Sequence, residues 1–137
     1  MKNLFIILFT AAVSGISCSH KLSPDQYWSD HRRVVTEMKQ APVQLSGTNR
    51  DAYLEFNTEE KRFTGNGGCN RLSGNYMPGK KNSIRFSEGI STKMSCADIA
   101  FETLFLAELN KVNRYEVTGN LMLLKDGNEV LLILERK

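Results

Sequence analysis

The feature that most constrains the fold of this sequence is a series of short apolar segments separated by turn residues. Each segment is four to six residues long, and the series occupies residues 52–56, 62–65, 72–77, 83–87, 114–118, 121–125 and 130–135. Runs of this length, bounded by glycine, proline, asparagine and aspartate, are typical of antiparallel strands. We therefore expect a mainly β (α+β) fold, in which about seven to eight short strands form an antiparallel barrel-like sheet.

The turn residues between the last three segments are specific. Gly119-Asn120 and Asp126-Gly127 are dipeptides that favour tight turns, so residues 114–135 are predicted to form a β meander. The last strand of that meander contains a continuous apolar run at 130–134, and we expect it to be covered on both faces or to cross the barrel interior. Residues 27–38 fit either a strand or one face of a helix.

A single amphipathic helix is predicted immediately before the meander. From Asp98 onward, apolar residues recur at spacings of three, four and seven, namely Phe101, Leu104, Phe105, Leu109 and Val112. This spacing places one apolar stripe against the sheet, and we expect Glu102 and Glu108 to lie on the opposite side of the helix. Ser95 and Asp98 supply the polar and acidic groups that favour a helix start.

The beginning of the chain has the features of an export signal. Lys2 precedes an apolar run at 4–13 that is too short to span a bilayer, and small residues at 14–17 lead to Cys18. We predict a lipoprotein-type signal peptide over residues 1–17, cleaved before Cys18. Lipid on Cys18 would then anchor the protein to the membrane. Plain secretion is the alternative.

The residues after Cys18 bear on the location of the protein. Residues 18–26 are polar and contain Pro24, so we expect a short tether between the lipid and the folded domain, which is predicted to occupy residues 27–137. Ser19, rather than aspartate, follows the cysteine and favours the outer membrane. The expected location is therefore the bacterial cell envelope, lipid-anchored at the outer membrane and facing the periplasm.

The cysteine count supports a disulfide. Three cysteines are an odd number for an exported protein, and lipidation of Cys18 leaves Cys69 and Cys96 as a pair. An oxidising compartment would let them join, and the bond would stabilise the fold by roughly 3 to 4 kcal/mol on the chain-entropy model. Two buried free thiols are the alternative. The only histidines, His20 and His31, lie far upstream, so we expect no metal site.

Two glycine-containing segments partly match phosphate-binding motifs. Backbone N–H groups at 65–68 could cradle an anion, but Asn70 stands where a dinucleotide fingerprint requires glycine and a strand follows. The glycines are better explained by positive φ values and close backbone approach. Residues 74–81 copy most of a P-loop, but Lys81 replaces the hydroxyl residue that would hold magnesium. We interpret that segment as a hairpin turn.

Composition also limits the classes of function. The formal net charge is +3 and the basic residues are scattered, so nucleic-acid binding is not expected. No serine lies in a strand-turn-helix context such as Gly-x-Ser-x-Gly, and no carboxylates carry a pairing signal. We therefore expect no catalytic residues and no cofactor.

Two motifs around the cysteines carry a family resemblance. The first reads Phe63-x-Gly65-x-Gly67-Gly68-Cys69-Asn70-Arg71-x-Ser73-Gly74-x-Tyr76 and the second Thr92-x-Met94-x-Cys96. Followed by a helix with Glu102 and a β meander, they resemble the META domain family, of the HslJ-like type found in a heat-inducible lipoprotein. The resemblance covers residues 27–137. It implies a compact antiparallel barrel-like fold with one helix, export and often lipidation, and a link to tolerance of heat and antibiotics. It supplies no catalytic residue.

Three functional hypotheses follow. The leading one is a non-enzymatic, lipid-anchored envelope protein that supports stress resistance by binding an envelope protein partner or stabilising envelope components, with Asn70 and Arg71 as candidate partner-binding residues. The second is a small-ligand carrier whose barrel encloses a cavity lined by Trp28, Phe56, Phe63, Tyr76 and Phe86. The third is an enzyme of unknown reaction, for which the sequence offers no site.

Overall fold

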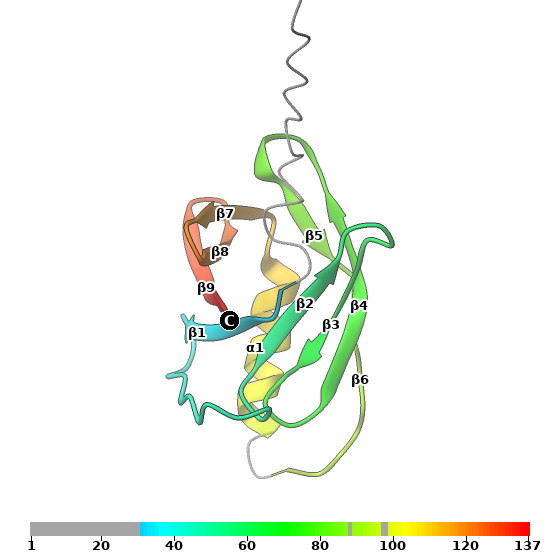
Figure 1. Cartoon of the computed structure of the whole chain (residues 1–137), viewed down its shortest axis with the longest axis vertical. Helices are drawn as coiled ribbons and strands as arrows, with labels where there is room; N and C mark the ends of the chain where they lie inside the picture. The colour runs from blue at the N-terminus through cyan, green and yellow to red at the C-terminus, as the bar shows by residue number, and fades with distance from the viewer. Residues whose placement is uncertain (1–30, 88, 97–98) are drawn as a thin grey trace, which may run out of the picture.

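The computed structural model describes residues 31–87, 89–96 and 99–137. The elements in chain order are β1 (Arg33–Met38), β2 (Tyr53–Asn57), β3 (Arg62–Asn66), β4 (Arg71–Pro78), the 3-10 turn η2 (Lys80–Asn82), β5 (Ile84–Phe86), β6 (Ile90–Ser91), α1 (Ile99–Lys111), β7 (Arg114–Thr118), β8 (Leu121–Asp126) and β9 (Glu129–Arg136) (Figure 1). The expected signal peptide, Cys18, the tether and Trp28 lie outside the described residues. Within the described part, no helix is long and apolar enough to cross a bilayer.

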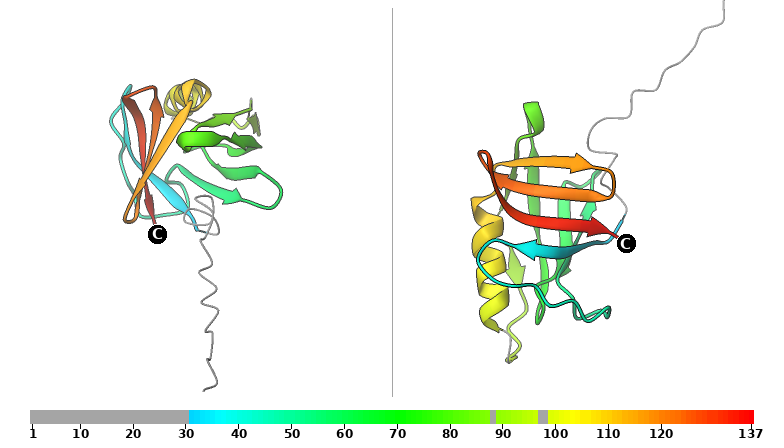
Figure 2. Two further views of the ribbon diagram at one scale, coloured as in Figure 1. Left: turned by 90° about the horizontal axis from the view of Figure 1, so that it is seen from above. Right: turned by 90° about the vertical axis from the view of Figure 1, so that its left-hand side faces the viewer.

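The strands form one antiparallel sheet that curls into a nearly closed barrel. Their order is β5-β4-β3-β2-β1-β9-β8-β7, and β6 pairs with β4 beside β5. The two ends of the sheet meet where Ser83 bridges Arg114 and the N–H of Ile84 donates to the carbonyl of Asn113 at 3.1 Å. Helix α1 packs against β5, β8 and β9, along the side where these ends meet (Figure 2). The expected fold is confirmed.

The strand predictions are confirmed closely. Each of the seven expected segments is a strand whose ends lie within one residue of the predicted bounds. Two strands were not predicted as such: β1, in the region that fitted strand or helix, and the two-residue β6. The turns behave as expected, because Gly119 and Gly127 adopt the positive φ values of +60° and +58° that tight hairpins require.

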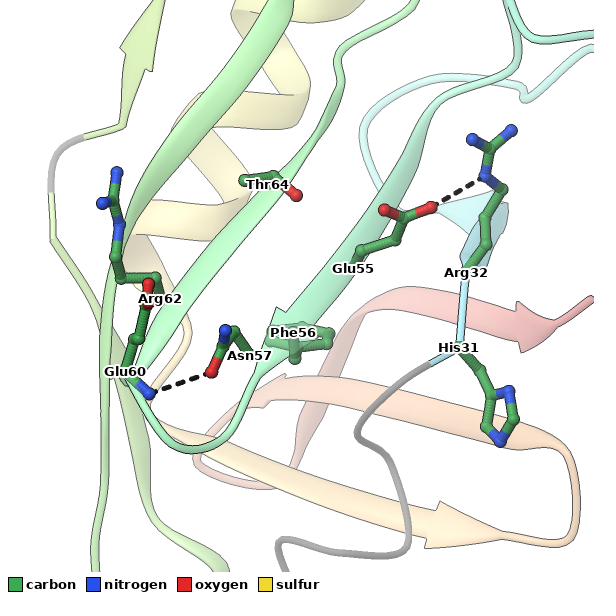
Figure 3. A pocket seen from close by; sticks show the side chains of 8 residues that line it. All are labelled: His31, Arg32, Glu55, Phe56, Asn57, Glu60, Arg62 and Thr64. Atoms are coloured by element: carbon green, nitrogen blue, oxygen red, sulfur yellow. Dashed lines mark hydrogen bonds and ion pairs between the residues drawn. The ribbon is translucent and has the colours of Figure 1, made fainter.

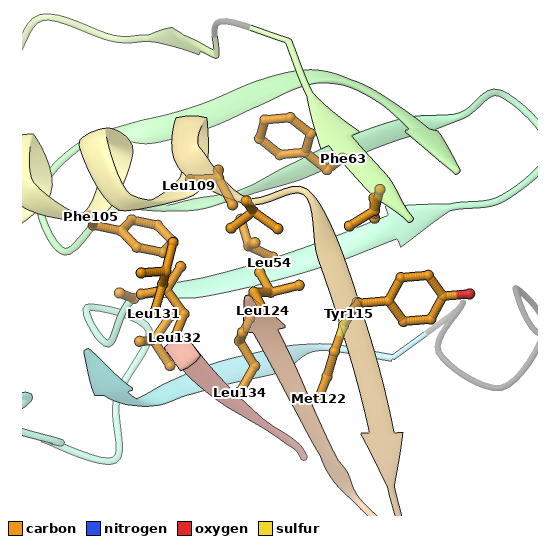
Figure 4. Packing of buried hydrophobic residues seen from close by; sticks show 14 of the residues in the cluster. Leu54, Phe63, Phe105, Leu109, Tyr115, Met122, Leu124, Leu131, Leu132 and Leu134 are labelled. Carbon is orange, nitrogen blue, oxygen red and sulfur yellow. The ribbon is translucent and has the colours of Figure 1, made fainter. Parts of the chain in front are cut away.

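Apolar side chains fill the barrel interior. Leu54, Leu124, Leu132 and Leu134 are fully buried, and Figure 4 shows the helix placing Phe105 and Leu109 against this cluster from one side. Complete burial of a side chain of this size stabilises the folded state by about 1.5 to 3 kcal/mol. The apolar run of β9 is buried largely as predicted, since β9 lies between β1 and β8 and its side chains at 131, 132 and 134 are covered.

Four aromatic side chains occupy the other half of the interior. Phe56 meets Tyr76 edge to face with ring centres 5.4 Å apart, and Phe63 meets Phe86 in the same way at 5.5 Å. These are the described members of the set that the carrier hypothesis assigned to a ligand cavity. They contact one another instead, so they form core packing.

The helix confirms one expectation and corrects another. Phe105 and Leu109 are buried as predicted, but Glu102 and Glu108 are also buried, with exposed fractions of 2% and 1%. The prediction that both glutamates lie opposite the apolar stripe is wrong. Position 102 lies three residues before 105, and 108 lies beside 109 and four before 112, so both belong to the covered side of the helix. Leu104, placed in the stripe, is 37% exposed.

Arg33 is a third buried charged residue, at the start of β1. Its side chain is 1% exposed, and burial, followed by repulsion from Arg136 in the adjacent strand, lowers the pKa of its guanidinium. Arg33 is therefore buried and does not belong to the exposed arginines described below.

Candidate functional site

The two cysteines join the turn between β3 and β4 to the segment that precedes α1. Cys69 and Cys96 form a disulfide with their Cα atoms 6.0 Å apart, across a sequence separation of 27 residues. The predicted bond is confirmed in the structure, and the alternative of two free thiols is not. The disulfide ties two loops that contain most of the family motif.

Asn70 is the centre of this junction. Its side chain is 1% exposed, and both polar atoms of its amide have hydrogen-bond partners. The amide nitrogen Nδ2 donates to Oε1 of Glu102 at 3.0 Å, while Oδ1 accepts from Oγ1 of Thr92 at 3.1 Å and from the backbone N–H of Met94 at 2.7 Å. Asn70 thus bridges three segments by hydrogen bonds.

Glu102 reaches into the same junction from the helix. Its Oε2 accepts the backbone N–H of Asn70 at 2.7 Å, and its Oε1 accepts the hydroxyl of Ser91 at 2.9 Å in addition to the Asn70 amide. Three donors therefore hold a buried carboxylate, which offsets the cost of removing it from water. This network is structural, and the sequence did not reveal the role of Glu102 because the helical spacing placed the residue opposite the apolar stripe.

The glycines beside Cys69 make room for this arrangement. A Cβ atom at Gly67 would lie 2.6 Å from Cγ of Glu102, and Gly68 has a φ of +104°. The N–H of Gly67 donates to the carbonyl of Asn70 at 2.9 Å, and that of Gly68 to Oδ1 of Asn66 at 2.6 Å. Both N–H groups are used within the turn, so the structural interpretation is confirmed and these two groups are not offered to an anion.

The structure separates the two candidate partner-binding residues. Asn70 lies inside the junction, whereas Arg71 is exposed at the start of β4. A hollow of about 320 Å³ lies over the junction and includes Thr92, Lys93 and Met94 in its lining. Partner binding by Asn70 and Arg71 stays a prediction, and in this geometry only Arg71 presents its side chain to the solvent.

A second set of polar residues lies on the outer face of the sheet formed by β2 to β5. Side chains alternate along a strand, so Arg62, Thr64 and Asn66 of β3 share the outer face. The register places Asn75, Ser73 and Arg71 of β4 directly beside them, and Arg85 of β5 beside Met77. We call this surface the arginine face, defined by Arg32, Arg62, Arg71 and Arg85.

The arginine face is hollowed between Arg32 and Arg62. The hollow has a volume of about 560 Å³ and is lined by His31, Arg32, Glu55, Phe56, Asn57, Glu60, Arg62 and Thr64 (Figure 3). Nε of Arg32 donates to Oε1 of Glu55 at 3.0 Å, and its guanidinium lies 3.9 Å above the ring centre of Tyr53. Arg32 is therefore held at one edge of the hollow.

The other arginines of this face have no such partners. The side chains of Arg62, Arg71 and Arg85 are exposed and make no hydrogen bond or ion pair with any described residue. Among residues 31–87, 89–96 and 99–137, no group of three or more His, Cys, Asp and Glu side chains could hold a metal ion. The arrangement offers charge and hydrogen-bond groups to a molecule that docks from outside.

Comparison with known proteins assigns the chain to a family. The sequence model of the META domain matches residues 28–137. The chain belongs to the META domain family. No curated protein matches this META domain sequence.

Solved structures share the META domain's fold. A protein from Burkholderia xenovorans, determined by NMR, is 24% identical with a TM-score of 0.67, covering 82% of this chain and 85% of that one. A second NMR structure is 21% identical with a TM-score of 0.62, covering 83% and 94%. A DUF4847 family protein from Bacteroides vulgatus, determined by crystallography, is 13% identical with a TM-score of 0.58, covering 81% and 95%. At these identities the likeness of the META domain to them concerns the fold alone.

Proposed function

We propose that this META domain is a non-enzymatic binding module of the bacterial cell envelope, held at the outer membrane by lipid on Cys18. It supports resistance to heat or antibiotics by binding an envelope partner on the arginine face. The observation that carries this proposal is the position of the polar hollow, which lies on the outside of the sheet while the interior is filled.

The contrast between the two sides of the sheet favours surface binding over transport of a small ligand. Inside, Phe56, Tyr76 and Phe86 contact one another with ring centres 5.4 to 6.5 Å apart. Outside, the hollow has exposed walls with donors and acceptors that a partner could meet without opening the barrel. A module of this kind needs no catalytic group.

The hollow can be filled without disturbing the core. Thr64 lines it, faces outward and pairs with Ser73 across the strands. Thr64→Trp would occupy the hollow, and Thr118→Trp on the exposed end of β7 is the matched control. In cells that lack the protein, the wild type and Thr118→Trp are expected to restore survival of heat or antibiotic exposure, whereas Thr64→Trp is expected to fail.

Two outcomes would contradict the proposal. Full restoration of survival by Thr64→Trp, at normal protein level and melting temperature, would show that the hollow is not required for the function. For the anchor, the Cys18→Ala variant is expected to leave the membrane fraction for the soluble fraction. Unchanged fractionation of Cys18→Ala would show that lipid on this residue does not hold the protein.

A further inference from the structure

We propose that the arginine face binds an anionic glycan, meaning a polysaccharide that carries carboxylate groups along its chain. This inference rests on the proposed function, because it names the chemical class of the partner that the outer face takes. Four features of the face support it: the type of basic residue, the excess of basic over acidic side chains, the spacing of the guanidinium groups and the neutral residues between them.

The basic residues within the strands of this face are all arginines. The chain has eight arginines and ten lysines, and the arginine face contains four of the arginines, at 32, 62, 71 and 85. No lysine lies in strands β2 to β6. A guanidinium presents five N–H donors in a planar fork that fits both oxygens of a carboxylate, whereas an ammonium acts as a point charge. The presence of arginine instead of lysine favours binding of an oxyanion whose two oxygens can pair with the guanidinium fork.

The face carries more basic than acidic side chains. Glu55 is the one acidic residue within strands β2 to β6 and pairs with Arg32 at 3.0 Å, and Glu60, in the turn between β2 and β3, lines the hollow together with Arg62. Arg71 and Arg85 lie outside the hollow, and neither forms an ion pair with a described residue. The outer side of the opposite strands is different, because Glu116 of β7 pairs with Lys125 of β8 at 3.1 Å. That basic side chain therefore already has an acidic partner.

The arginines are arranged along a path. Arg71 pairs with Asn66, four residues along β3 from Arg62, so the backbones are separated by about 13 Å at 3.3 Å per residue. Arg85 lies two strands away from Arg62, which is about 10 Å across the sheet. Guanidinium groups this far apart can bind several anionic groups along one extended polymer, but they cannot all bind the same small anion.

Short neutral side chains lie between the arginines. Thr64 and Ser73 face each other across β3 and β4, and Asn75 lies beside Arg62. Their hydroxyl and amide groups can donate to and accept from sugar hydroxyls. The ring of Tyr53, the one outward aromatic of β2 and β3, is covered by Arg32. Stacking of nucleic-acid bases therefore has no open platform on these strands, which favours a glycan.

The test measures binding of the purified protein to two probes of matched length. Polygalacturonate, a glycan with one carboxylate on each sugar, is expected to bind, and neutral dextran is not. Replacing Arg62, Arg71 and Arg85 by Gln is expected to weaken binding by roughly tenfold or more and to flatten its dependence on salt concentration. The matched control removes the same charge elsewhere, with Lys39→Gln, Arg50→Gln and Lys137→Gln, and should retain affinity within about twofold.

A third variant tests the arginine fork itself. Replacement of the same three arginines by Lys keeps the charge, so the salt dependence is expected to remain while the affinity still falls. Equal weakening by the arginine and control triple variants would overturn the inference, since it would mean that only net charge matters. Tighter binding to DNA or to vesicles of anionic phospholipid than to polygalacturonate would overturn it as well.

The outcomes separate this inference from the proposed function. If polygalacturonate does not bind but Thr64→Trp still abolishes survival, the glycan inference is wrong, while the proposed function of the hollow is still supported. If the glycan binds but Thr64→Trp restores survival fully, the surface binds an anionic glycan without the proposed role in resistance.

Discussion

Glu102 holds Asn70 by two hydrogen bonds, one to the backbone N–H at 2.7 Å and one to the side-chain amide at 3.0 Å. Both residues are buried, with exposed fractions of 2% and 1%. Through this pair, the helix fixes the turn between β3 and β4, and the disulfide attaches the same turn to the segment before the helix. Arg71, which follows Asn70 directly, is positioned on the arginine face by this double attachment.

Glu102→Gln is expected to destabilise the protein by about 2 kcal/mol. Each carboxylate oxygen accepts a donor from the junction, so either orientation of the glutamine amide places its NH₂ group against another donor. Urea unfolding measures the change. Glu116→Gln, on the exposed side of β7, is the control and should change stability by less than about 0.5 kcal/mol. Equal stabilities for the two variants would contradict the structural role of Glu102.

Glu108→Leu is expected to have the opposite effect. Oε1 of Glu108 accepts from Nζ of Lys111 at 2.7 Å, but Oε2 is buried and has no hydrogen-bond partner among the described residues. Replacing a poorly satisfied buried charge by an apolar side chain is often neutral or stabilising, and the exposed Lys111 can remain in water. We expect a gain of about 1 kcal/mol in unfolding free energy, and a loss larger than that would show that the glutamate is satisfied.

Removal of the disulfide tests the other attachment of the turn. The double variant Cys69→Ser, Cys96→Ser should lose about 3 kcal/mol in unfolding free energy, because the bond restricts the unfolded chain. The circular dichroism spectrum of the folded state should remain the same. Alkylation of denatured, unreduced wild-type protein should modify neither cysteine, and modification of both would refute the bond.

Asp51 should give a pH-dependent contribution to stability. Burial acts to raise the pKa of its carboxyl, but hydrogen bonds from Ser46, Gly47 and Thr48 outweigh burial and lower the pKa below its ordinary value of 3.8. A carboxyl with a lowered folded-state pKa stabilises the fold above its unfolded pKa and loses that effect as pH falls through the folded pKa.

The measurement compares melting temperatures of the wild type and Asp51→Asn. The variant should melt lower at neutral pH, and the difference should shrink below about pH 4 as Asp51 becomes protonated. The effect is modest because Asp51 is largely in contact with solvent. A difference that is independent of pH would show that the charge of Asp51 does not contribute.

The sheet could be predicted from the sequence because its strands are short, apolar and bounded by turn residues. Gly119-Asn120 and Asp126-Gly127 act locally, so their hairpins follow from the dipeptides alone. The strand β6 could not be predicted in this way, since its two residues are strand only because they pair with Leu72 and Ser73 of β4. Pairing between distant segments overrides local propensity here.

The candidate site was less accessible to sequence reasoning. Glu102 was predicted to lie opposite the apolar stripe, because the spacing of apolar residues alone defined the covered side of the helix. Its partners, Asn70 and Ser91, are 32 and 11 residues away in the sequence. Arg62 and Thr64 are two residues apart, as are Arg71 and Ser73, so the sequence places each pair on one face of its strand. That the two pairs share the same face of the sheet follows only when the register between β3 and β4 is known.

The most direct test of the central claim, that a partner binds on the outer face and not in the interior, is an NMR titration of isotopically labelled protein with polygalacturonate. Binding on the outer face should produce shift changes at the amides of residues 62–66, 71–75 and 85, which follow the arginine face. The interior positions Leu124 and Leu134 should remain unchanged. Shift changes concentrated at those interior residues, or on the outer side of β7 to β9, would contradict the account.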